Sequence, residues 1–137
     1  MNDGSDRVAV QVLVVDDQVP FRDAARTVID RLVGFDVIGE AESGEEAIER
    51  VALDVPDLVL MDINMGAMDG IEATRRIVAR HPAIRVILLS TYELSDLPPE
   101  ARSSGAMAYV NKDEFGGRTL RRLWEQGGDP SFRSHAG

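Results

Sequence analysis

The chain has 137 residues and a mass of 15.0 kDa, which suits one compact domain. Its 24 acidic and 15 basic side chains give a formal net charge of −9, which disfavours direct binding to nucleic acid or to an anionic membrane surface. The absence of cysteine excludes disulfides, thiolate metal sites and thiol catalysis, and no apolar run approaches the length of a membrane span. We therefore expect a cytoplasmic protein with no membrane association.

Apolar, β-branched runs alternate with segments of helical periodicity along the chain. In order, the sequence predicts a strand at 8–15, a helix from 20 that ends at Gly34, a strand at 35–41, a helix from 44 to about 52, a strand at 57–63, a helix at 69–81, a strand at 85–90, a short helix from about 99, a strand at 107–110 and a helix from 115 to about 127. Within the first helix, Val33 is expected to face the core. Pro98-Pro99 forbids a regular helix across 94–104.

Strands that alternate with helices in this way predict a parallel sheet covered on both faces, because parallel neighbours need crossover connections. The predicted fold class is therefore α/β and doubly wound, with five strands. We place the domain at 1–127 and expect 128–137 to be a flexible C-terminal tail, since that stretch has no periodicity.

Four of the predicted strands end in polar side chains: Asp16 and Asp17, Asp62 and then Asn64, Ser90 and Thr91, and Asn111 and Lys112. Ligands of open α/β sheets bind at this edge. Three carboxylates brought together repel one another, so we expect a cation between them, and an all-oxygen ligand set favours Mg²⁺. With a hydroxyl group and the only lysine of the chain nearby, the site suits phosphoryl transfer to Asp62 as nucleophile.

A Ca²⁺-binding EF-hand loop is a poor alternative. Asp62 and Asn64 match such a loop, but Ala67 stands where the turn glycine belongs and Ala73 where the bidentate glutamate belongs.

The motifs VLVVDD, LVLMDINMGAMDG, VILLST and AYVNKD, in this order and spacing, resemble the response-regulator receiver domain of two-component signalling, and most closely the NarL/FixJ-type receivers. The resemblance covers residues 10–126. It implies a flavodoxin-like (βα)5 fold with strand order 2-1-3-4-5. It also implies a phosphoprotein that takes part in phosphorelay signal transduction.

The resemblance implies that Asp62 accepts a phosphoryl group from a histidine kinase or a phosphotransfer protein. Mg²⁺ would be held by Asp16, Asp17 and Asp62, together with the main-chain oxygen of Asn64. The other implied roles are phosphoryl binding and switching by Ser90, Thr91, Lys112 and Tyr109, and tuning of the phosphoryl lifetime by Asn64 and Tyr92. The output would be an unidentified downstream protein partner, without direct nucleic acid binding by this chain. A phosphorylation-dependent homodimer is left open.

The sequence departs from the family pattern at two places. Gly66 stands where the family usually has proline, so we expect a more mobile loop, and Pro98-Pro99 is expected to reshape the output surface. NarL/FixJ-type proteins normally continue into a helix-turn-helix, whereas eleven residues follow Gln126 here, so the chain is either a stand-alone receiver or a fragment.

Two other functions compete with the phosphoacceptor switch. A Mg²⁺-dependent phosphohydrolase with an aspartyl nucleophile would need a D-x-D pattern after the first strand, which Asp16-Asp17-Gln18 does not supply. A phosphorylation-independent receiver-like module is disfavoured because the acidic, hydroxyl and lysine positions are all intact. We expect no enzymatic activity beyond the domain's own phosphorylation and dephosphorylation.

Overall fold

The computed structural model describes residues 9–133. Five parallel strands form one sheet in the order β2-β1-β3-β4-β5. Their bounds are β1 (Val10–Val15), β2 (Phe35–Ala41), β3 (Leu58–Asp62), β4 (Arg85–Ser90) and β5 (Ala108–Asn111). The predicted α/β class, the parallel sheet and the strand order are confirmed. The predicted start of the first strand, residue 8, lies outside the described residues.

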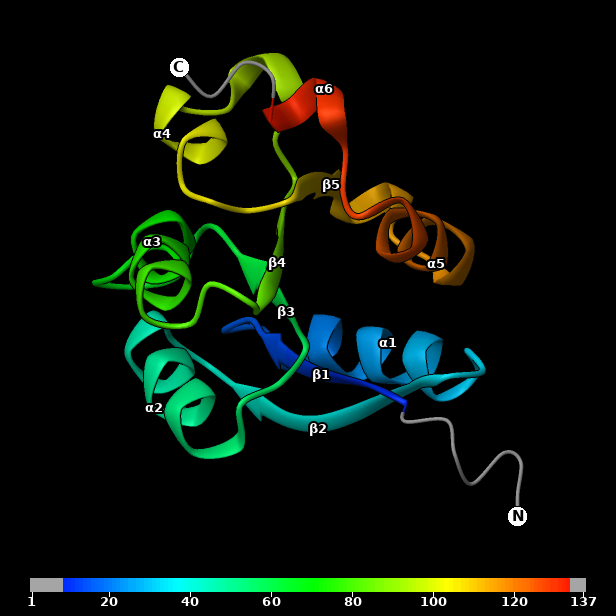
Figure 1. The fold of residues 1–137 in the computed structure, drawn as a ribbon. Helices are drawn as coiled ribbons and strands as arrows, with labels where there is room; N and C mark the ends of the chain where they lie inside the picture. The colour runs from blue at the N-terminus through cyan, green and yellow to red at the C-terminus, as the bar shows by residue number, and fades with distance from the viewer. Residues whose placement is uncertain (1–8, 134–137) are drawn as a thin grey trace.

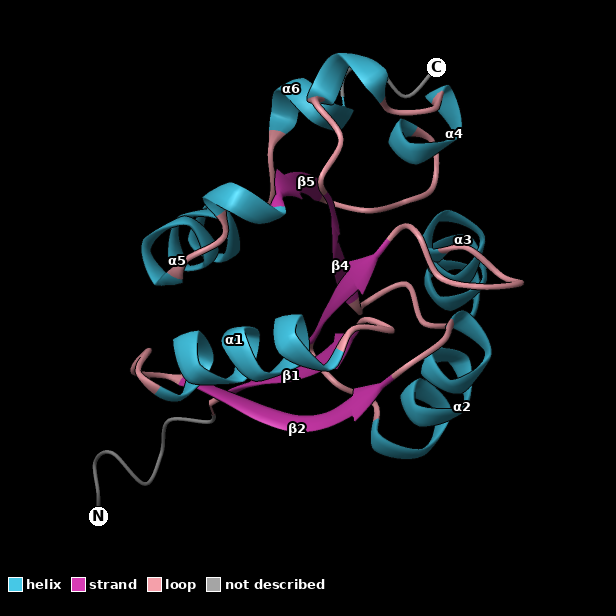
Figure 2. Ribbon diagram, turned by 180° about the vertical axis from the view of Figure 1, so that it is seen from behind, coloured by secondary structure: helices cyan, strands magenta, loops and turns pink. Residues whose placement is uncertain are grey.

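Helices cover both faces of the sheet (Figures 1 and 2). One face carries α1 (Val19–Asp30) and α5 (Gly117–Gln126), and the other carries α2 (Gly44–Asp54) and α3 (Gly70–Arg80). The short helix α6 (Pro130–Arg133) lies near β5, and the short helix α4 (Pro99–Arg102) precedes β5 in the chain. The 3-10 turn η2 (Leu94–Asp96) follows β4, and the 3-10 turn η3 (Lys112–Glu114) follows β5. Among residues 9–133, no helix has the length and apolar character needed to cross a bilayer.

The apolar core consists of two layers because the central strands β1, β3 and β4 are buried on both faces for most of their length. In β1, Val12 and Val14 pack toward α1 and α5, whereas Leu13 and Val15 pack toward α2 and α3. All four side chains are at most 1% exposed. Such burial explains why the strands read as continuous apolar runs rather than as an alternating pattern.

The helix after β3 begins where its sequence predicts. The Asp69 side chain accepts a hydrogen bond from Glu72 N at 2.9 Å, which satisfies a free amide of the first turn. This cap fixes where the chain leaves the loop that follows Asp62. The short fourth helix is also confirmed, since α4 begins at Pro99.

The prediction that the first helix continues to Gly34 with Val33 turned inward is wrong. The helix α1 ends at Asp30, and Val33 is 81% exposed. Gly34 has a left-handed φ of 91°, and its carbonyl oxygen accepts a hydrogen bond from Val10 N at 2.8 Å. The turn at Gly34 leads the chain into β2. The helix therefore ends several residues before the apolar pattern of the sequence does.

The expectation of a flexible tail is wrong for residues 128–133. These residues include α6, and Asp129 N donates a hydrogen bond to the carbonyl oxygen of Met107 at 2.9 Å. Phe132 is only 2% exposed. Burial of one large aromatic side chain contributes about 1.5–3 kcal/mol, which helps to order a segment too short to form a helix alone. Residues 134–137 lie outside the described part.

Candidate functional site

Three carboxylates meet at the carboxyl edge of the sheet. Asp16 follows β1 and is fully buried, Asp62 ends β3 and is 3% exposed, and Asp17 is exposed. One oxygen atom of each lies within 4.8 Å of the other two. The expected convergence of these residues is therefore confirmed, because parallel strands bring their carboxyl ends to one edge.

Lys112 reaches this edge from the end of β5. Its Nζ atom lies 2.6 Å from Asp16 Oδ2 and 3.4 Å from Asp62 Oδ1, and 4.6 Å from the centre of the Phe21 ring. The Asp16 contact is an ion pair without the alignment of a hydrogen bond, since Asp16 Oδ2 is buried and has no hydrogen-bond partner in the described part of the chain. That oxygen can therefore accept a further cation.

The donor set fits a hard divalent cation. Within the described part of the chain, all side-chain ligand atoms of the cluster are carboxylate oxygens, which Mg²⁺ prefers, and no histidine contributes to it. The Lys112 ammonium group neutralises part of the negative charge that the three carboxylates carry together. A second positive charge would offset the remaining repulsion between Asp16 and Asp62.

Burial and neighbouring charge act in opposite directions on Asp62. Burial and the charge of Asp16 raise the pKa of Asp62 from 3.8 to about 6, although Lys112 opposes this shift. Burial also acts to lower the pKa of Lys112, but its contacts with Asp16 and Asp62 outweigh burial and raise that pKa. Asp62 is therefore a carboxylate of increased basicity beside a protonated amine, which is a suitable state for a nucleophile.

Ser90 and Tyr109 form a second group at this edge. The Ser90 Oγ atom lies 2.7 Å from the Tyr109 hydroxyl oxygen and accepts a hydrogen bond from Tyr92 N at 3.0 Å. The Tyr109 hydroxyl group also donates to the carbonyl oxygen of Tyr92 at 2.5 Å. Burial raises the pKa of Tyr109, so its hydroxyl group remains a donor at neutral pH. Thr91, beside Ser90, is exposed.

The two residues expected to tune the phosphoryl lifetime contact each other. Tyr92 Oη donates a hydrogen bond to Asn64 Oδ1 at 3.2 Å, across the mouth of the site. Asn64 also begins the loop that contains Gly66, whose φ of 39° lies in the left-handed region. Proline has its φ fixed near −65° and cannot adopt this conformation. The loop backbone at Gly66 therefore differs from the one that a proline at this position would impose.

A positioning contact that sequence reasoning missed comes from α1. Arg22 Nη1 donates a hydrogen bond to the main-chain oxygen of Asp16 at 2.7 Å, and its Nε donates to Glu40 at 2.9 Å. Phe21, the preceding residue in α1, lies under the Lys112 ammonium group. No local pattern indicates these contacts, because they depend on how α1 approaches the sheet.

Gly70, the first residue of α3, packs directly against the backbone of Asp62. A Cβ atom at this position would collide with the Asp62 carbonyl oxygen and would lie 2.8 Å from Met61 Cγ. We expect Gly70→Ala to lower the free energy of unfolding by about 1–3 kcal/mol, measured by urea denaturation, because backbone must move. Gly117→Ala is the control, since its nearest neighbour would be Leu32 Cδ1 at 3.4 Å. Equal stability of the two variants would contradict the tight packing.

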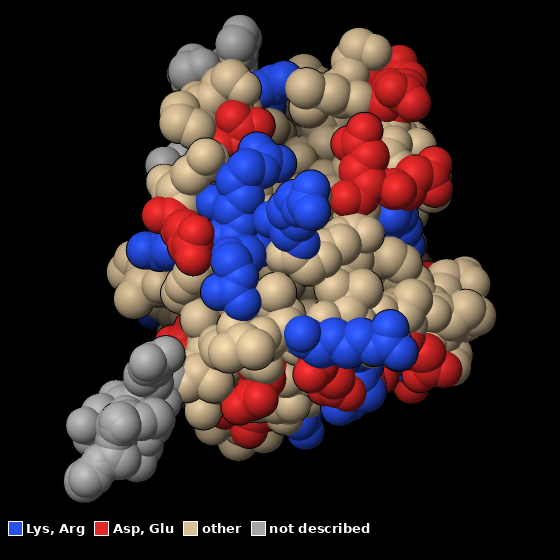
Figure 3. Space-filling model, turned by 90° about the vertical axis from the view of Figure 1, so that its right-hand side faces the viewer, with Lys and Arg blue, Asp and Glu red and all other residues tan. Residues whose placement is uncertain are grey.

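Charge on the face of α1 and α5 is mixed. Figure 3 shows a central cluster of Lys and Arg side chains there, with Asp and Glu side chains around it and further basic side chains apart from it. The helix α5, whose sequence includes Arg118, Arg121 and Arg122, lies on this side of the molecule. The cluster is too closely bordered by acids to form an extended cationic surface on the face shown.

Comparison with known proteins identifies the class that this fold and site define. The sequence matches the family model of the response regulator receiver domain over residues 12–123. The chain therefore belongs to the response regulator receiver domain family, the receiver module of two-component systems.

Individual relatives agree with this family. The response regulator GacA of Pseudomonas viridiflava is 38% identical over 107 residues, which are 75% of this chain and 48% of that protein. A protein-glutamate methylesterase/protein-glutamine glutaminase of Pseudoalteromonas atlantica is 41% identical over 107 residues, 77% of this chain and 28% of that protein. The chain thus spans about half the length, or less, of these curated relatives. The NarL signal receiver domain structure from Mycobacterium tuberculosis is similar with a TM-score of 0.78 and 27% identity, covering 87% of this chain and 96% of that one.

Proposed function

We propose that this receiver domain accepts a phosphoryl group on Asp62 in the presence of Mg²⁺ and thereby switches protein–protein contacts. The observation that carries the proposal is the position of Lys112 Nζ, 2.6 Å from Asp16 and 3.4 Å from Asp62, at an edge where three carboxylates meet. A partly buried ammonium group in this place can hold Asp62 ionised and can then contact a phosphoryl oxygen.

In the proposed reaction, Asp62 attacks the phosphorus atom of a phosphohistidine in a histidine kinase or phosphotransfer protein. A bond forms between an Asp62 carboxylate oxygen and phosphorus while the bond from phosphorus to the donor imidazole breaks, and the imidazole nitrogen keeps the electron pair. Asp16, Asp17, Asp62 and the main-chain oxygen of Asn64 would hold Mg²⁺. When bound, Mg²⁺ offsets negative charge on the phosphoryl oxygens.

The side chains around Asp62 have separate proposed roles. Lys112 keeps Asp62 ionised before transfer and pairs with the phosphoryl group afterwards. Ser90 donates its hydroxyl hydrogen to a phosphoryl oxygen, and in doing so gives up its contact with Tyr109. Thr91, next to Ser90, is proposed as a further phosphoryl contact, although its side chain is exposed at the rim.

We propose that the domain acts as a switch and not as an enzyme with its own substrate. The match to the methylesterase of Pseudoalteromonas atlantica covers 28% of that protein, so it gives no ground for assigning that activity here. We propose that the domain acts in the cytoplasm between a histidine kinase or phosphotransfer protein and a downstream protein. Family membership supports this order of partners, and a phosphorylation-dependent homodimer would be one form of output.

Mg²⁺ is expected to stabilise the wild-type domain. At a free concentration several-fold above its Kd, Mg²⁺ should raise the free energy of unfolding by about 1 kcal/mol, or Tm by about 3–6 °C, by mass action. Asp17→Asn should lose most of this shift, because an exposed ligand is removed without disturbing the core. Asp36→Asn, at an exposed position of β2, is the control that retains it. The same shift in all three proteins would contradict the assignment of the metal ligands.

A further inference from the structure

The C-terminal helix α6 covers a part of the sheet that α4 leaves open. The helix α4 contains four residues, because Pro98 and Pro99 shorten it from its N-terminal side. Figures 1 and 2 both show α6 above β5, and Arg102 of α4 contacts α6 through a hydrogen bond to the carbonyl oxygen of Phe132. Its Phe132 joins Ala101 of α4 and Ala106 in the same apolar layer. Residues 127–133, which we call the strap, therefore complete the core beside the edge strand β5.

Contacts with Met107 and with Arg102 hold the strap in place. Asp129 N donates a hydrogen bond to the carbonyl oxygen of Met107 at 2.9 Å. Arg102 of α4 donates from Nη1 to the carbonyl oxygen of Phe132 at 2.9 Å, and its guanidinium carbon lies 5.1 Å from the centre of the Phe132 ring. A helix of four residues has no stability of its own. The strap thus depends on the seat of Phe132, so it belongs to the segments that can open locally.

Two glycines connect the strap to α5. Gly127 and Gly128 have φ values of 74° and 115°. At Gly128 a Cβ atom would lie 2.6 Å from the carbonyl oxygen of Met107, so the chain passes close to the backbone at the start of β5. Glycine permits this path and also permits other paths at low cost, which suits a hinge.

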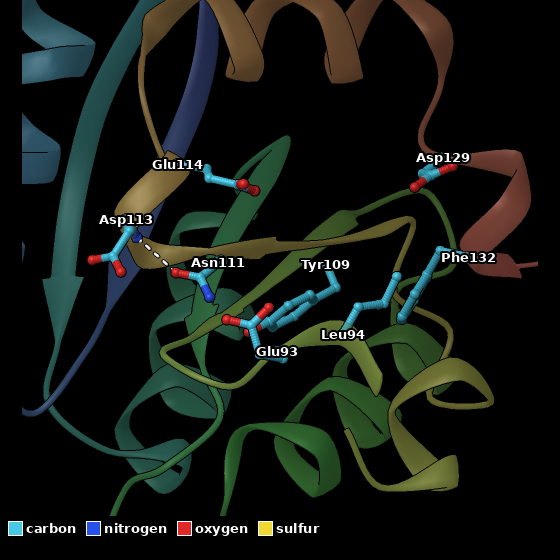
Figure 4. Close-up of a pocket in the computed structure, with 8 residues that line it drawn as sticks. All are labelled: Glu93, Leu94, Tyr109, Asn111, Asp113, Glu114, Asp129 and Phe132. Atoms are coloured by element: carbon cyan, nitrogen blue, oxygen red, sulfur yellow. Dashed lines mark hydrogen bonds between the residues drawn. The ribbon is translucent and has the colours of Figure 1, made fainter. Parts of the chain in front are cut away.

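The seat of Phe132 shares a cavity with Tyr109. The cavity has a volume of about 330 Å³, and Phe132, Leu94 and Tyr109 form its apolar part (Figure 4). In this view Leu94 lies between the rings of Tyr109 and Phe132. Tyr109 and Phe132 also belong to one apolar cluster. The open volume gives the Tyr109 ring room to move, and its movement would change the wall beside Phe132.

Tyr109 is connected to the proposed phosphorylation site by hydrogen bonds of its hydroxyl group. These bonds run to Ser90 Oγ at 2.7 Å and to the carbonyl oxygens of Ser90 at 3.1 Å and Tyr92. A phosphoryl group that takes the Ser90 hydroxyl would remove the first of them. The Tyr109 hydroxyl group would then keep its contacts with the carbonyl oxygens of Ser90 and Tyr92 but lose its contact with the Ser90 side chain.

We propose that the strap is a conformational device coupled to the phosphorylation site: Phe132 stays seated while Tyr109 is bound to Ser90, and the strap opens when that contact is lost. The proposal rests on the proposed function, because phosphorylation of Asp62 is the event that would claim Ser90. Opening exposes the Phe132 seat beside β5 as new apolar surface. The state with the strap seated and the state with the strap open therefore differ in the apolar surface exposed near α4, away from Asp62.

Hydrogen exchange of residues 127–133 in the full chain tests this coupling. Tyr109→Phe keeps the ring but removes every hydroxyl bond, and we expect it to speed exchange in the strap by about threefold or more without any phosphodonor. Tyr92→Phe is the matched control, since its hydroxyl contacts Asn64 and not the strap, and it should exchange like the wild type. Arg102→Gln removes the hydrogen bond to the Phe132 carbonyl oxygen. Its exchange rate in residues 127–133 serves as the reference for a strap that is held less tightly. Wild-type rates in Tyr109→Phe would overturn the coupling.

The wild type is measured in parallel with Mg²⁺ and acetyl phosphate, and the intact mass of each sample reports phosphorylation. A phosphoryl adduct together with faster exchange of the strap supports the proposal. An adduct with unchanged exchange overturns the strap and leaves the proposed function intact. Absence of an adduct overturns the proposed function and with it phosphorylation as the trigger, while the Tyr109→Phe result still decides whether the tyrosine holds the strap.

Discussion

Lys112→Met is expected to lower the free energy of unfolding by about 3 kcal/mol at pH 7.5 in Mg²⁺-free buffer. Among residues 9–133, Lys112 is the cation that forms ion pairs with the buried carboxylates of Asp16 and Asp62, at 2.6 and 3.4 Å, and only 16% of its side chain is exposed. Methionine preserves much of the apolar stem over Phe21 but leaves both charges unpaired. Urea denaturation measures the loss.

The pH dependence of this loss identifies its cause. Lys112 opposes the raised pKa of Asp62, so its removal moves that pKa further above about 6 and Asp62 accepts a proton more readily. The destabilisation should therefore shrink as the pH falls from 7.5 to 5. Combining Lys112→Met with Asp62→Asn should recover most of the stability, since one buried charge is then absent. Arg118→Met, at an exposed position of α5, is the control; an equal loss in that variant would exclude the ion pair as the cause.

Asp62→Asn is expected to stabilise the Mg²⁺-free domain by about 2 kcal/mol at pH 7.5. The pKa of Asp62 is raised from 3.8 in the unfolded chain to about 6 in the fold, mainly by burial and then by the charge of Asp16. Between these values the folded state holds a proton that the unfolded state has released, so the stability of the wild type falls as the pH rises from about 4 to 6. The full difference corresponds to about 3 kcal/mol, part of which asparagine loses through its weaker contact with Lys112.

The gain from Asp62→Asn should disappear near pH 4, where the wild-type carboxyl group is protonated in the fold. Denaturation curves at several pH values in the presence of a chelator measure this trend. Asp36→Asn, which is exposed, should show no such dependence. A gain that is constant from pH 4 to 7.5 would mean that charge at Asp62 carries no cost in the fold.

The sheet and the acidic edge could be predicted because their signals are local. The central strands β1, β3 and β4 are largely apolar runs, and Asp16, Asp17 and Asp62 stand where two of these runs end. The rule that parallel strands share a carboxyl edge then brings the residues together. Lys112 was found in the same way, at the end of the last run.

Other parts of the structure depend on contacts between distant segments. The support of Asp16 by Arg22 and the contact of Tyr92 with Asn64 follow from loop and helix positions that no periodicity encodes. The strap was missed because four helical residues make barely one turn and carry one buried side chain, Phe132, so no period can appear. Its two glycines and its proline give the segment the composition of a flexible tail, although the structure contains a helix there. Val33 was misplaced because the turn at Gly34 ends the helix before the apolar pattern stops.

Phosphorylation of Asp62 is tested most directly by intact-protein mass spectrometry after incubation with acetyl phosphate, with and without Mg²⁺. The wild type should gain the mass of a single phosphoryl group only when Mg²⁺ is present, and peptide mapping should place that group on residue 62. Asp62→Asn should show no adduct, whereas Asp36→Asn should be labelled like the wild type. A folded wild-type protein that gains no phosphoryl group, or an adduct that persists in Asp62→Asn, would contradict the assignment of Asp62 as phosphoacceptor.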